Sequence, residues 1–413
     1  MILNYLKLAW KVLLRHPFYT FITLFGISLT LTVLMVLTSF LDHLIGAHYP
    51  ETKRNRSLYI TRLEQRDTTH QGRNMGPMSF DFLKTYAKSL KTPERVGIAT
   101  IFGFANTYIN GKRIKLNTKY TDADFWRVTE FKFLDGKPFT EQNINNGDHV
   151  VVITDDLRKQ YFEDEEASVI GKYIDIESIN YRVIGVVQGS PVTRPYTYGD
   201  VYFPYTAPKS NYQNKAMRGG FLAIVLAKDE QDFPSIRAEY ASTVGKIPLP
   251  QTDGGFTFQE MKTEANTYLD DFASVFLDGA RTTIVYSIIV FLMLMLMGLP
   301  AINLVNVNVS RIMERASEIG VRKAFGAPAK ALLWQFIIEN IFITFIGGVF
   351  ALLLAFLIIT LINNSGWIPY ADLTINFTVF TASIAVCLVF GLLSGVLPAL
   401  RMSKLKIVDA LKS

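Results

Sequence analysis

The fold is decided by residues 310–340, which read SRIMERASEIGVRKAFGAPAKALLWQFIIEN. Arg315, Glu318 and Arg322 share one face of a helix, and Glu318 precedes Arg322 by four positions, the favourable order for an ion pair. Gly326 suits the end of that helix, and the proline two residues later suits the first turn of the next one. We therefore predict a short charged helix, a sharp turn and a second helix that is strongly apolar.

Four stretches of the chain are nearly free of charge and long enough to span a hydrocarbon core. They are residues 18–41, 281–304, 331–362 and 377–400. The first is too long for the apolar part of a cleaved signal peptide and lacks a small-x-small cleavage site, so we expect an uncleaved anchor. The predicted fold class is an α-helical membrane protein with four transmembrane helices. A large α+β extracytoplasmic domain, residues 42–280, is inserted between the first and second helices.

The distribution of basic residues predicts the orientation. Residues 1–17, 305–330 and 401–413 carry twelve Lys and Arg against three acidic residues, whereas residues 363–376 carry no Lys or Arg. Because basic residues concentrate in cytoplasmic loops, both termini should be cytoplasmic and the large domain periplasmic. The net charge of +6 is then a topology signal and does not indicate nucleic-acid binding. Residues 1–17 have amphipathic spacing, which fits either a simple anchor or a helix that also packs against a partner subunit.

The large domain alternates strand and helix signals. We predict a hairpin at the Asn110-Gly111 turn and helices over residues 81–90, 122–133 and 258–271. Cys387, the only cysteine, lies in the fourth predicted span, so no disulfide can form within the chain.

Motifs for catalysis are missing from this sequence. No G-x-x-x-x-G-K-[ST] occurs, so we expect no ATP site in this chain. The five histidines have no metal-binding spacing, and no G-x-S-x-G is present. The sequence therefore predicts a non-catalytic membrane subunit without a metal or cofactor of its own.

Several motifs in order along the chain closely resemble the MacB/FtsX/LolC–LolE permease superfamily. They include residues 315–327 with Gln335, Phe336 and Glu339, and the tail over residues 394–412. Residues 122–125 with 136–139, and then 150–153, 171–172 and 181–187, are similar to the MacB-type periplasmic core domain. Ile407 stands where a proline is usual in the family. The resemblance covers nearly the whole chain.

The resemblance implies the permease subunit of an ABC transporter in the bacterial inner membrane. In that family, two permeases, identical or related, bind ATP-binding cassette ATPase subunits in the cytoplasm. The ATPase that is fused to MacB is not in this sequence, so we expect ATP and Mg²⁺ on a separate chain. Mechanotransmission would then export a peptide, drug or lipoprotein, in some systems with a periplasmic adaptor and an outer-membrane channel. The alternative is an FtsX-like signalling permease that regulates cell-wall hydrolases.

The resemblance also implies that residues 305–330 form the helix that couples to the ATPase. The residues expected to make this coupling are Arg311, Arg315, Glu318, Ile319, Gly320, Arg322, Lys323 and Gly326. The residue pattern alone leaves two readings equally open, a charged loop that only fixes topology and a rigid lever. Pro300 should kink the end of the second span. Glu339, near the start of the third, fits a structural role better than proton coupling.

Overall fold

The computed structural model describes residues 10–11, 13–15, 17–109, 111–162, 168–253, 255–276, 283–284, 286–295, 298, 302, 329–367, 369–370 and 372–389. The chain divides into two compact units. The helical unit comprises Met1–His43, Thr283–Trp367 and Ala371–Ser413. The α+β domain comprises Leu44–Thr282 and Ile368–Tyr370.

Two helices among the described residues are long and apolar enough to cross a membrane. They are α2 (Pro17–Ile45) and α11 (Ala329–Asn364), with apolar segments over Thr20–Ile45 and Ile337–Asn364. Shorter apolar helices cover Tyr286–Met295 and Phe377–Val389. The predicted four spans therefore correspond to two full-length helices and two shorter ones in the part of the chain that the structure describes. The last two residues of α2 already belong to the α+β domain.

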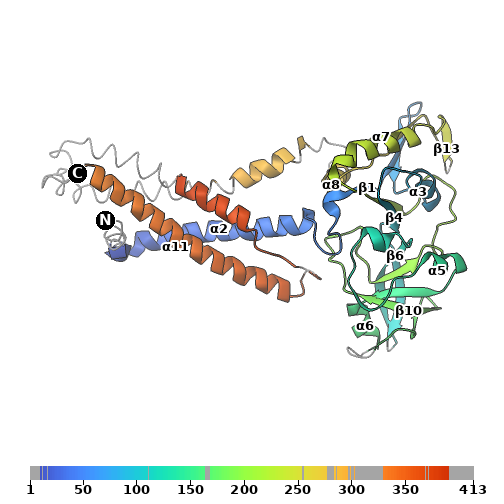
Figure 1. Ribbon diagram of the computed structural model, residues 1–413, viewed down its shortest axis with the longest axis horizontal. Coiled ribbons are helices and arrows are strands. Elements are labelled where there is room, and N and C mark those ends of the chain that lie inside the picture. The colour runs from blue at the N-terminus through green and yellow to red at the C-terminus, as the bar shows by residue number, and fades with distance from the viewer. Residues whose placement is uncertain are drawn as a thin grey trace. The chain divides into compact units, whose positions relative to one another are not determined.

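Small residues bring α2 and α11 together in the helical unit (Figure 1). A Cβ atom added to Gly347 would lie 2.7 Å from Ile27 Cγ2, so only glycine permits this approach. Ser28 Oγ donates to the Gly347 carbonyl oxygen over 3.1 Å, and Thr32 Oγ1 donates to the Ala351 carbonyl oxygen over 3.3 Å. Gly347 and Ala351 follow the small-xxx-small spacing of close helix pairs in membranes.

Large apolar side chains lie on the outside of the helical unit. Those on α2 that are exposed include Phe18, Phe21, Phe25, Leu29 and Val33, and those on α11 include Phe345, Leu353, Phe356 and Leu361. Hydroxyl and small side chains are buried between the helices, as the contacts of α2 with α11 show. This arrangement places large apolar groups where a bilayer would contact them.

The α+β domain is built on a ten-stranded mixed sheet with the order β1-β12-β4-β6-β11-β8-β10-β7, with β5 paired to β6 and β9 to β10. Two central strands, β8 (Val150–Thr154) and β12 (Phe221–Leu226), are buried along their whole length, as continuous apolar runs predict. β8 pairs with β10 in parallel, and β6 pairs with β11 in parallel. The other paired strands of the sheet are antiparallel.

The remaining elements complete the domain. The other strands are β1 (Ser57–Ile60), β2 (Leu63–Asp67), β3 (Gly72–Gly76), β4 (Arg95–Thr100), β5 (Phe104–Ile109), β6 (Lys112–Thr121), β7 (Phe133–Gly136), β9 (Tyr173–Ile176), β10 (Ile179–Val187), β11 (Val201–Pro204), β13 (Gln251–Asp253), β14 (Phe256–Phe258) and β15 (Glu260–Lys262). The helices are α3 (Phe80–Tyr86), α4 (Phe125–Val128), α5 (Glu141–Asn146), α6 (Asp155–Phe162), α7 (Phe233–Val244) and α8 (Tyr268–Phe276), with 3-10 turns at Arg54–Arg56 and Glu230–Asp232.

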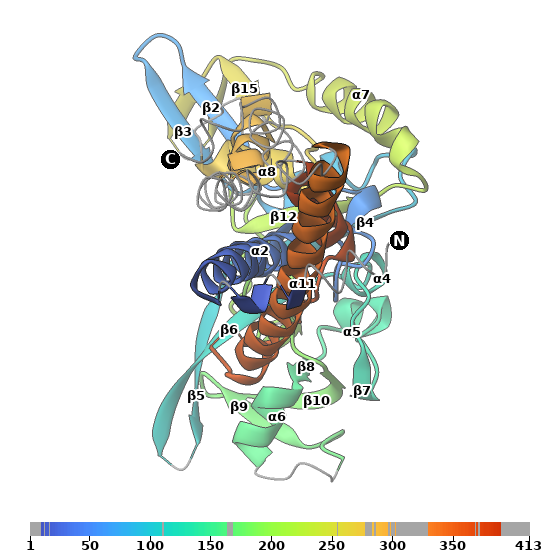
Figure 2. The ribbon, with the colours of Figure 1, turned by 90° about the vertical axis from the view of Figure 1, so that its left-hand side faces the viewer.

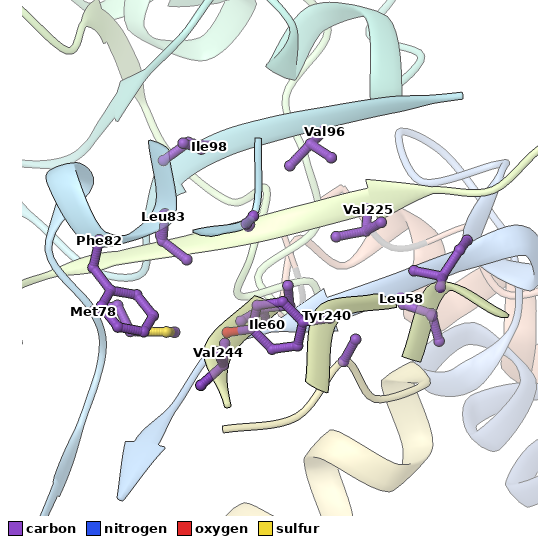
Figure 3. Close-up of a cluster of buried hydrophobic side chains, with 14 of the residues drawn as sticks. Leu58, Ile60, Met78, Phe82, Leu83, Val96, Ile98, Val225, Tyr240 and Val244 are labelled. Atoms are coloured by element: carbon purple, nitrogen blue, oxygen red, sulfur yellow. The ribbon is translucent and has the colours of Figure 1, made fainter. Parts of the chain in front are cut away.

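Helices cover the two ends of this sheet. In Figure 1, α3 and α7 lie at the end that carries β1 and β4, and α6 lies near β10 at the other end. Figure 3 shows the core beneath α3 and α7, where Leu58 and Ile60 of β1 and Val225 of β12 face Tyr240 and Val244 of α7. The sheet and these helices therefore form one packed core at that end.

Local signals in the sequence fix two of these elements. Ser79 caps α3 by accepting a hydrogen bond from the Phe82 backbone nitrogen over 3.1 Å, which confirms the expected start of a helix there. The predicted hairpin is also confirmed, since β5 and β6 pair in register around Gly111, whose φ is +75°. Figure 2 shows this hairpin and the β2–β3 hairpin extending from the body of the domain.

The prediction of a helix over residues 122–133 is wrong. Only α4 is helical, and Thr129 is already extended, with φ −101° and ψ 162°. Leaving the helix after one turn lets Trp126 and Phe131 both contact Tyr202, with ring centroids 5.3 Å away in each case. Aromatic packing has therefore overridden the local helical pattern.

The prediction of a helix over residues 258–271 is wrong in its first half. Glu260–Lys262 form β15, which pairs with β2, and α8 begins only at Tyr268. Strand β2 supplies hydrogen-bond partners that a sequence pattern cannot reveal.

Candidate functional site at the root of the α+β domain

The predicted coupling residues lie outside the described part of the chain. These are Arg311, Arg315, Glu318, Ile319, Gly320, Arg322, Lys323 and Gly326, and Pro300 lies outside it as well. Glu339 is described and lies on α11 with 1% of its surface exposed. The candidate site described below lies where the α+β domain begins and ends along the chain, near Leu44 and Tyr268.

Two buried arginines bind the backbone where α2 ends. Arg54 Nη1 donates to the carbonyl oxygens of Leu44 and Ile45 over 2.6 and 3.1 Å. Arg194 Nη2 donates to the Gly46 carbonyl oxygen over 3.1 Å. The last carbonyls of a helix lack intrahelical donors and carry partial negative charge, so cations stabilise them. Arg54 and Arg194 thereby fasten the end of α2 to the domain.

Glu51 supplies the counter-charge for both arginines. Its Oε2 accepts from Arg54 Nε over 2.8 Å and from Arg54 Nη2 over 2.6 Å, and it lies 3.8 Å from Arg194 Nη1. Thr197 Oγ1 donates to Glu51 Oε1 over 2.9 Å. Burial alone would raise the pKa of the Glu51 carboxyl, but the charges of Arg54 and Arg194 outweigh burial and hold the pKa below its usual value. The carboxylate therefore stays ionised.

Helix α8, which precedes the second apolar stretch in the chain, joins the same cluster. Its first residue, Tyr268, lies under the Arg54 guanidinium, with 3.7 Å between Cζ and the ring centroid. Asp271, one turn later, accepts hydrogen bonds from the hydroxyls of Thr61 and Tyr196. Burial raises the pKa of Asp271 above its ordinary value, against those two hydrogen bonds. We call Glu51, Arg54, Arg194 and Asp271 the root cluster.

One loop connects the parts of the root cluster. Residues 188–200, here called the hub loop, contain no helix or strand and are mostly buried. The loop supplies Arg194, Tyr196 and Thr197, which bond to the residue after α2, to α8 and to Glu51, respectively. Its own backbone is held by turns such as the bond from the Thr197 nitrogen to the Arg194 oxygen, 3.0 Å.

A buried lysine holds the hub loop against the sheet. Lys119 Nζ on β6 donates to the carbonyl oxygens of Thr100, Ile101 and Pro195 over 2.9, 2.5 and 2.7 Å. Burial lowers the pKa of the Lys119 amine to about 7, while the charge of Glu51 acts in the opposite direction. Three carbonyl acceptors match the three donors of an ammonium group, so the charged form of Lys119 can bond to all three of them.

The root cluster is suited to holding its segments of chain in place. Among the described residues, no group of three or more His, Cys, Asp or Glu side chains could hold a metal ion. A cavity of about 70 Å³ adjoins Thr61, Asp271 and Ser274. It is well below the roughly 300–1,000 Å³ of typical small-molecule sites. The described chemistry is therefore a buried ionic junction where two segments of chain that lead to apolar helices meet.

Sequence reasoning did not find this junction. Glu51 and Arg54 read as ordinary charges after an apolar stretch, and Arg194 lies in a loop far along the chain. Their pairing depends on the fold of the sheet between them. A local signal was the series of polar and aromatic residues from 194 to 198, RPYTY. Loops usually lie on the surface, yet Arg194, Tyr196 and Thr197 of this loop are buried.

The described chain thus consists of an apolar helical unit and a large mixed α+β domain whose first and last segments meet at a buried ionic root. The sequence pattern of the MacB-like periplasmic core domain matches residues 20–242, more than half of the chain, and that of the FtsX-like permease C-terminal domain matches residues 287–407. The chain therefore belongs to the MacB/FtsX family of ABC transporter permeases, and its α+β domain is the MacB-like periplasmic core domain.

The chain is similar to two curated proteins and to one solved structure. The macrolide export ATP-binding/permease protein MacB of Shewanella sp. strain ANA-3 is 25% identical over 98% of this chain and 60% of that protein. An uncharacterized ABC transporter permease, YvrN, of Bacillus subtilis strain 168 is 25% identical over 70% of this chain and 68% of that protein. The periplasmic region of MacB from Actinobacillus actinomycetemcomitans aligns with 16% identity and a TM-score of 0.37 over 55% of this chain and 94% of that one. The chain thus spans 60% of the length of the Shewanella relative.

Proposed function

We propose that this chain is the non-catalytic permease subunit of an ABC transporter of the mechanotransmission type. A separate ATPase subunit binds ATP and Mg²⁺, and a second permease completes the dimer. Four helices cross the bacterial inner membrane, with both termini cytoplasmic and the α+β domain in the periplasm. ATP hydrolysis moves that domain and drives export of a peptide, drug or lipoprotein, where required with a periplasmic adaptor and an outer-membrane channel.

The observation that supports this proposal is the root cluster. Arg54 binds the last carbonyls of α2 while its guanidinium covers Tyr268, the first residue of α8. A displacement of either helix therefore acts on the same buried ion pair, and through the hub loop on the central sheet. A transmission device needs such a stiff connection, whereas a channel subunit would need a lined path. Family membership supports the ATPase partnership.

Residues 305–330 receive the force from the ATPase in this proposal. Arg311, Arg315, Glu318, Ile319, Gly320, Arg322, Lys323 and Gly326 form the contact. Pro300 and Glu339 keep structural roles in the neighbouring spans.

Charge reversal in the coupling helix tests the proposal. The tagged chain is purified from its own membranes, and the Mg²⁺-dependent ATP hydrolysis that elutes with it is measured. Glu318→Lys and Arg322→Glu should abolish the co-eluting activity, while Arg113→Glu, on the exposed β5–β6 hairpin, should preserve it. The assignment of the coupling helix is wrong if both variants keep the activity of the unmodified chain.

A further inference from the structure

A short segment outside the periplasmic core sequence belongs to that domain in space. Ile368–Tyr370 follows α11 in the chain and precedes the helix Phe377–Val389, yet it groups with the α+β domain. Tyr370 is half-buried, and its φ of +57° lies in the left-handed region that a tyrosine rarely adopts. Such a conformation persists when surrounding contacts hold the residue.

The contacts of Tyr370 are specific. Its hydroxyl donates to Asp155 Oδ1 over 2.8 Å, and the Gly189 backbone nitrogen donates to the same oxygen over 3.0 Å. The Tyr370 ring occupies the place that a Cβ atom on residue 189 would take. Burial, and then the carboxylates of Asp156 and Asp155, raise the pKa of Tyr370 well above its usual value. The hydroxyl therefore keeps the proton that it donates.

This docking site lies at the ends of two paired strands inside the sheet. Asp155 directly follows β8, and Gly189 is the second residue after β10. These two strands pair in parallel, and Val187 and Thr154 are their last paired residues. Tyr370 thus lies at the carboxyl ends of two central strands. Gly189 also belongs to the hub loop, whose Arg194 and Tyr196 bind the segments after α2 and in α8.

We propose that Tyr370 is a third anchor of the periplasmic domain, which docks the segment between the third and fourth apolar helices onto the hub loop. Two anchors, at α2 and α8, are continuous with the chain of the domain. In the part of the chain that the structure describes, the third is held through the Tyr370 hydroxyl, which bonds to Asp155, and through the Tyr370 ring, which lies against Gly189, so it can separate while the other two remain. This inference rests on the proposed function for its role in transmission, but the docking itself stands apart from any ATPase.

Hydrogen exchange on the full chain in lipid nanodiscs, without an ATPase, tests the docking. Tyr370→Phe removes only the hydroxyl and should speed exchange of the Gly189 amide roughly tenfold, the value of one hydrogen bond to a charged group. Tyr370→Ala should speed it at least as much. Tyr108→Phe, at an exposed tyrosine on β5, should leave it unchanged. Exchange at Gly189 that stays within twofold of the unmodified chain in both Tyr370 variants overturns the anchor.

A glycine replacement gives an independent test. Gly189→Ala should place a methyl group in the Tyr370 ring and speed exchange across residues 189–200. Adding Tyr370→Ala should relieve the clash, so that the double variant exchanges no faster than Tyr370→Ala alone. Gly220→Ala, where a Cβ meets nothing within 4 Å, is the matched control. A double variant that remains as perturbed as Gly189→Ala contradicts the docking.

Failure of the proposed function and failure of the Tyr370 anchor give different experimental results. If Glu318→Lys and Arg322→Glu leave co-eluting ATP hydrolysis intact, the coupling helix is wrong, while the exchange results still decide the anchor. If exchange shows docking but Tyr370→Phe leaves hydrolysis by the purified complex unchanged, the transmission role of the anchor is overturned.

Discussion

Glu51→Gln is the sharpest test of the root cluster, because it keeps the shape of the side chain and removes the charge. Two guanidinium groups, on Arg54 and Arg194, would then share a buried site without a carboxylate. Removing one partner of a buried ion pair costs about 3–5 kcal/mol. The carbonyl oxygens of Leu44, Ile45 and Gly46 still accept from the arginines, so we expect the lower end, about 3 kcal/mol. That loss corresponds to an opening constant roughly 150-fold larger.

Native-state hydrogen exchange on the full chain in nanodiscs measures this constant. The amide of Tyr59, which bonds to the Asn266 carbonyl oxygen over 2.7 Å, reports opening between β1 and the segment before α8. Glu130→Gln is the control, because Glu130 is 48% exposed and pairs with Lys53 at the surface. That control should change the opening free energy by less than about 1 kcal/mol. If Glu51→Gln changes the opening constant at the Tyr59 amide by less than twofold, the claim that the ion pair holds the junction is refuted.

The protection of the Tyr59 amide should depend on pH in a direction that can be predicted. The pKa of Glu51 is lower in the folded chain than its ordinary value of 4.5. Its contribution is therefore present above pH 4.5 and is lost as the pH falls through the lower, folded value. The unmodified chain should lose protection at Tyr59 below about pH 4.5, relative to Glu51→Gln. If protection at Tyr59 falls equally in both chains as the pH is lowered, a group other than Glu51 controls the loss.

Two further predictions concern Lys119 and the helix pair. Because the pKa of Lys119 is about 7 in the folded chain and 10.5 unfolded, the stability of the unmodified chain relative to Lys119→Met should rise between pH 7 and 9, by up to about 1.4 kcal/mol per pH unit. Urea unfolding, monitored by hydrogen exchange at pH 7 and pH 9, measures the stability of both chains. A difference in stability between them that does not change with pH contradicts the assignment of a lowered pKa to Lys119. Gly347→Val should overpack the contact with Ile27 and cost about 1–3 kcal/mol. Thermal unfolding in detergent should show a lower midpoint temperature for this variant. Gly298→Ala should leave the midpoint unchanged, because a Cβ atom on residue 298 has no neighbour within 4 Å.

The sequence predicted those parts of the molecule that depend on local pattern. The hairpin of β5 and β6 follows from the Asn110-Gly111 turn, and α3 begins close to the start of the helix predicted over residues 81–90. The apolar runs likewise predicted helices where α2 and α11 lie. These features are encoded within one or two turns of chain, so periodicity and capping residues suffice to find them.

The root cluster could not be predicted, because its members are distant in sequence and are brought together by strand pairing. Asp271, for example, accepts a hydrogen bond from Thr61, which lies 210 residues earlier in the chain. The same cause explains the wrong helix over residues 258–271, where pairing of β15 with β2 decides the structure. A pattern of residue types gives a probability of helix or strand, whereas pairing partners are a property of the whole sheet.

An ionic root has a mechanical consequence that an apolar one would not have. Apolar side chains can slide past each other with little change in contact energy, because the hydrophobic effect is non-directional. The contacts of Arg54 with Glu51 and with the carbonyls of Leu44 and Ile45 are short and directional. Bending of the chain at the end of α2 would break them and leave a guanidinium buried without its partners. The root cluster therefore opposes a local bend of the chain at residues 44–54.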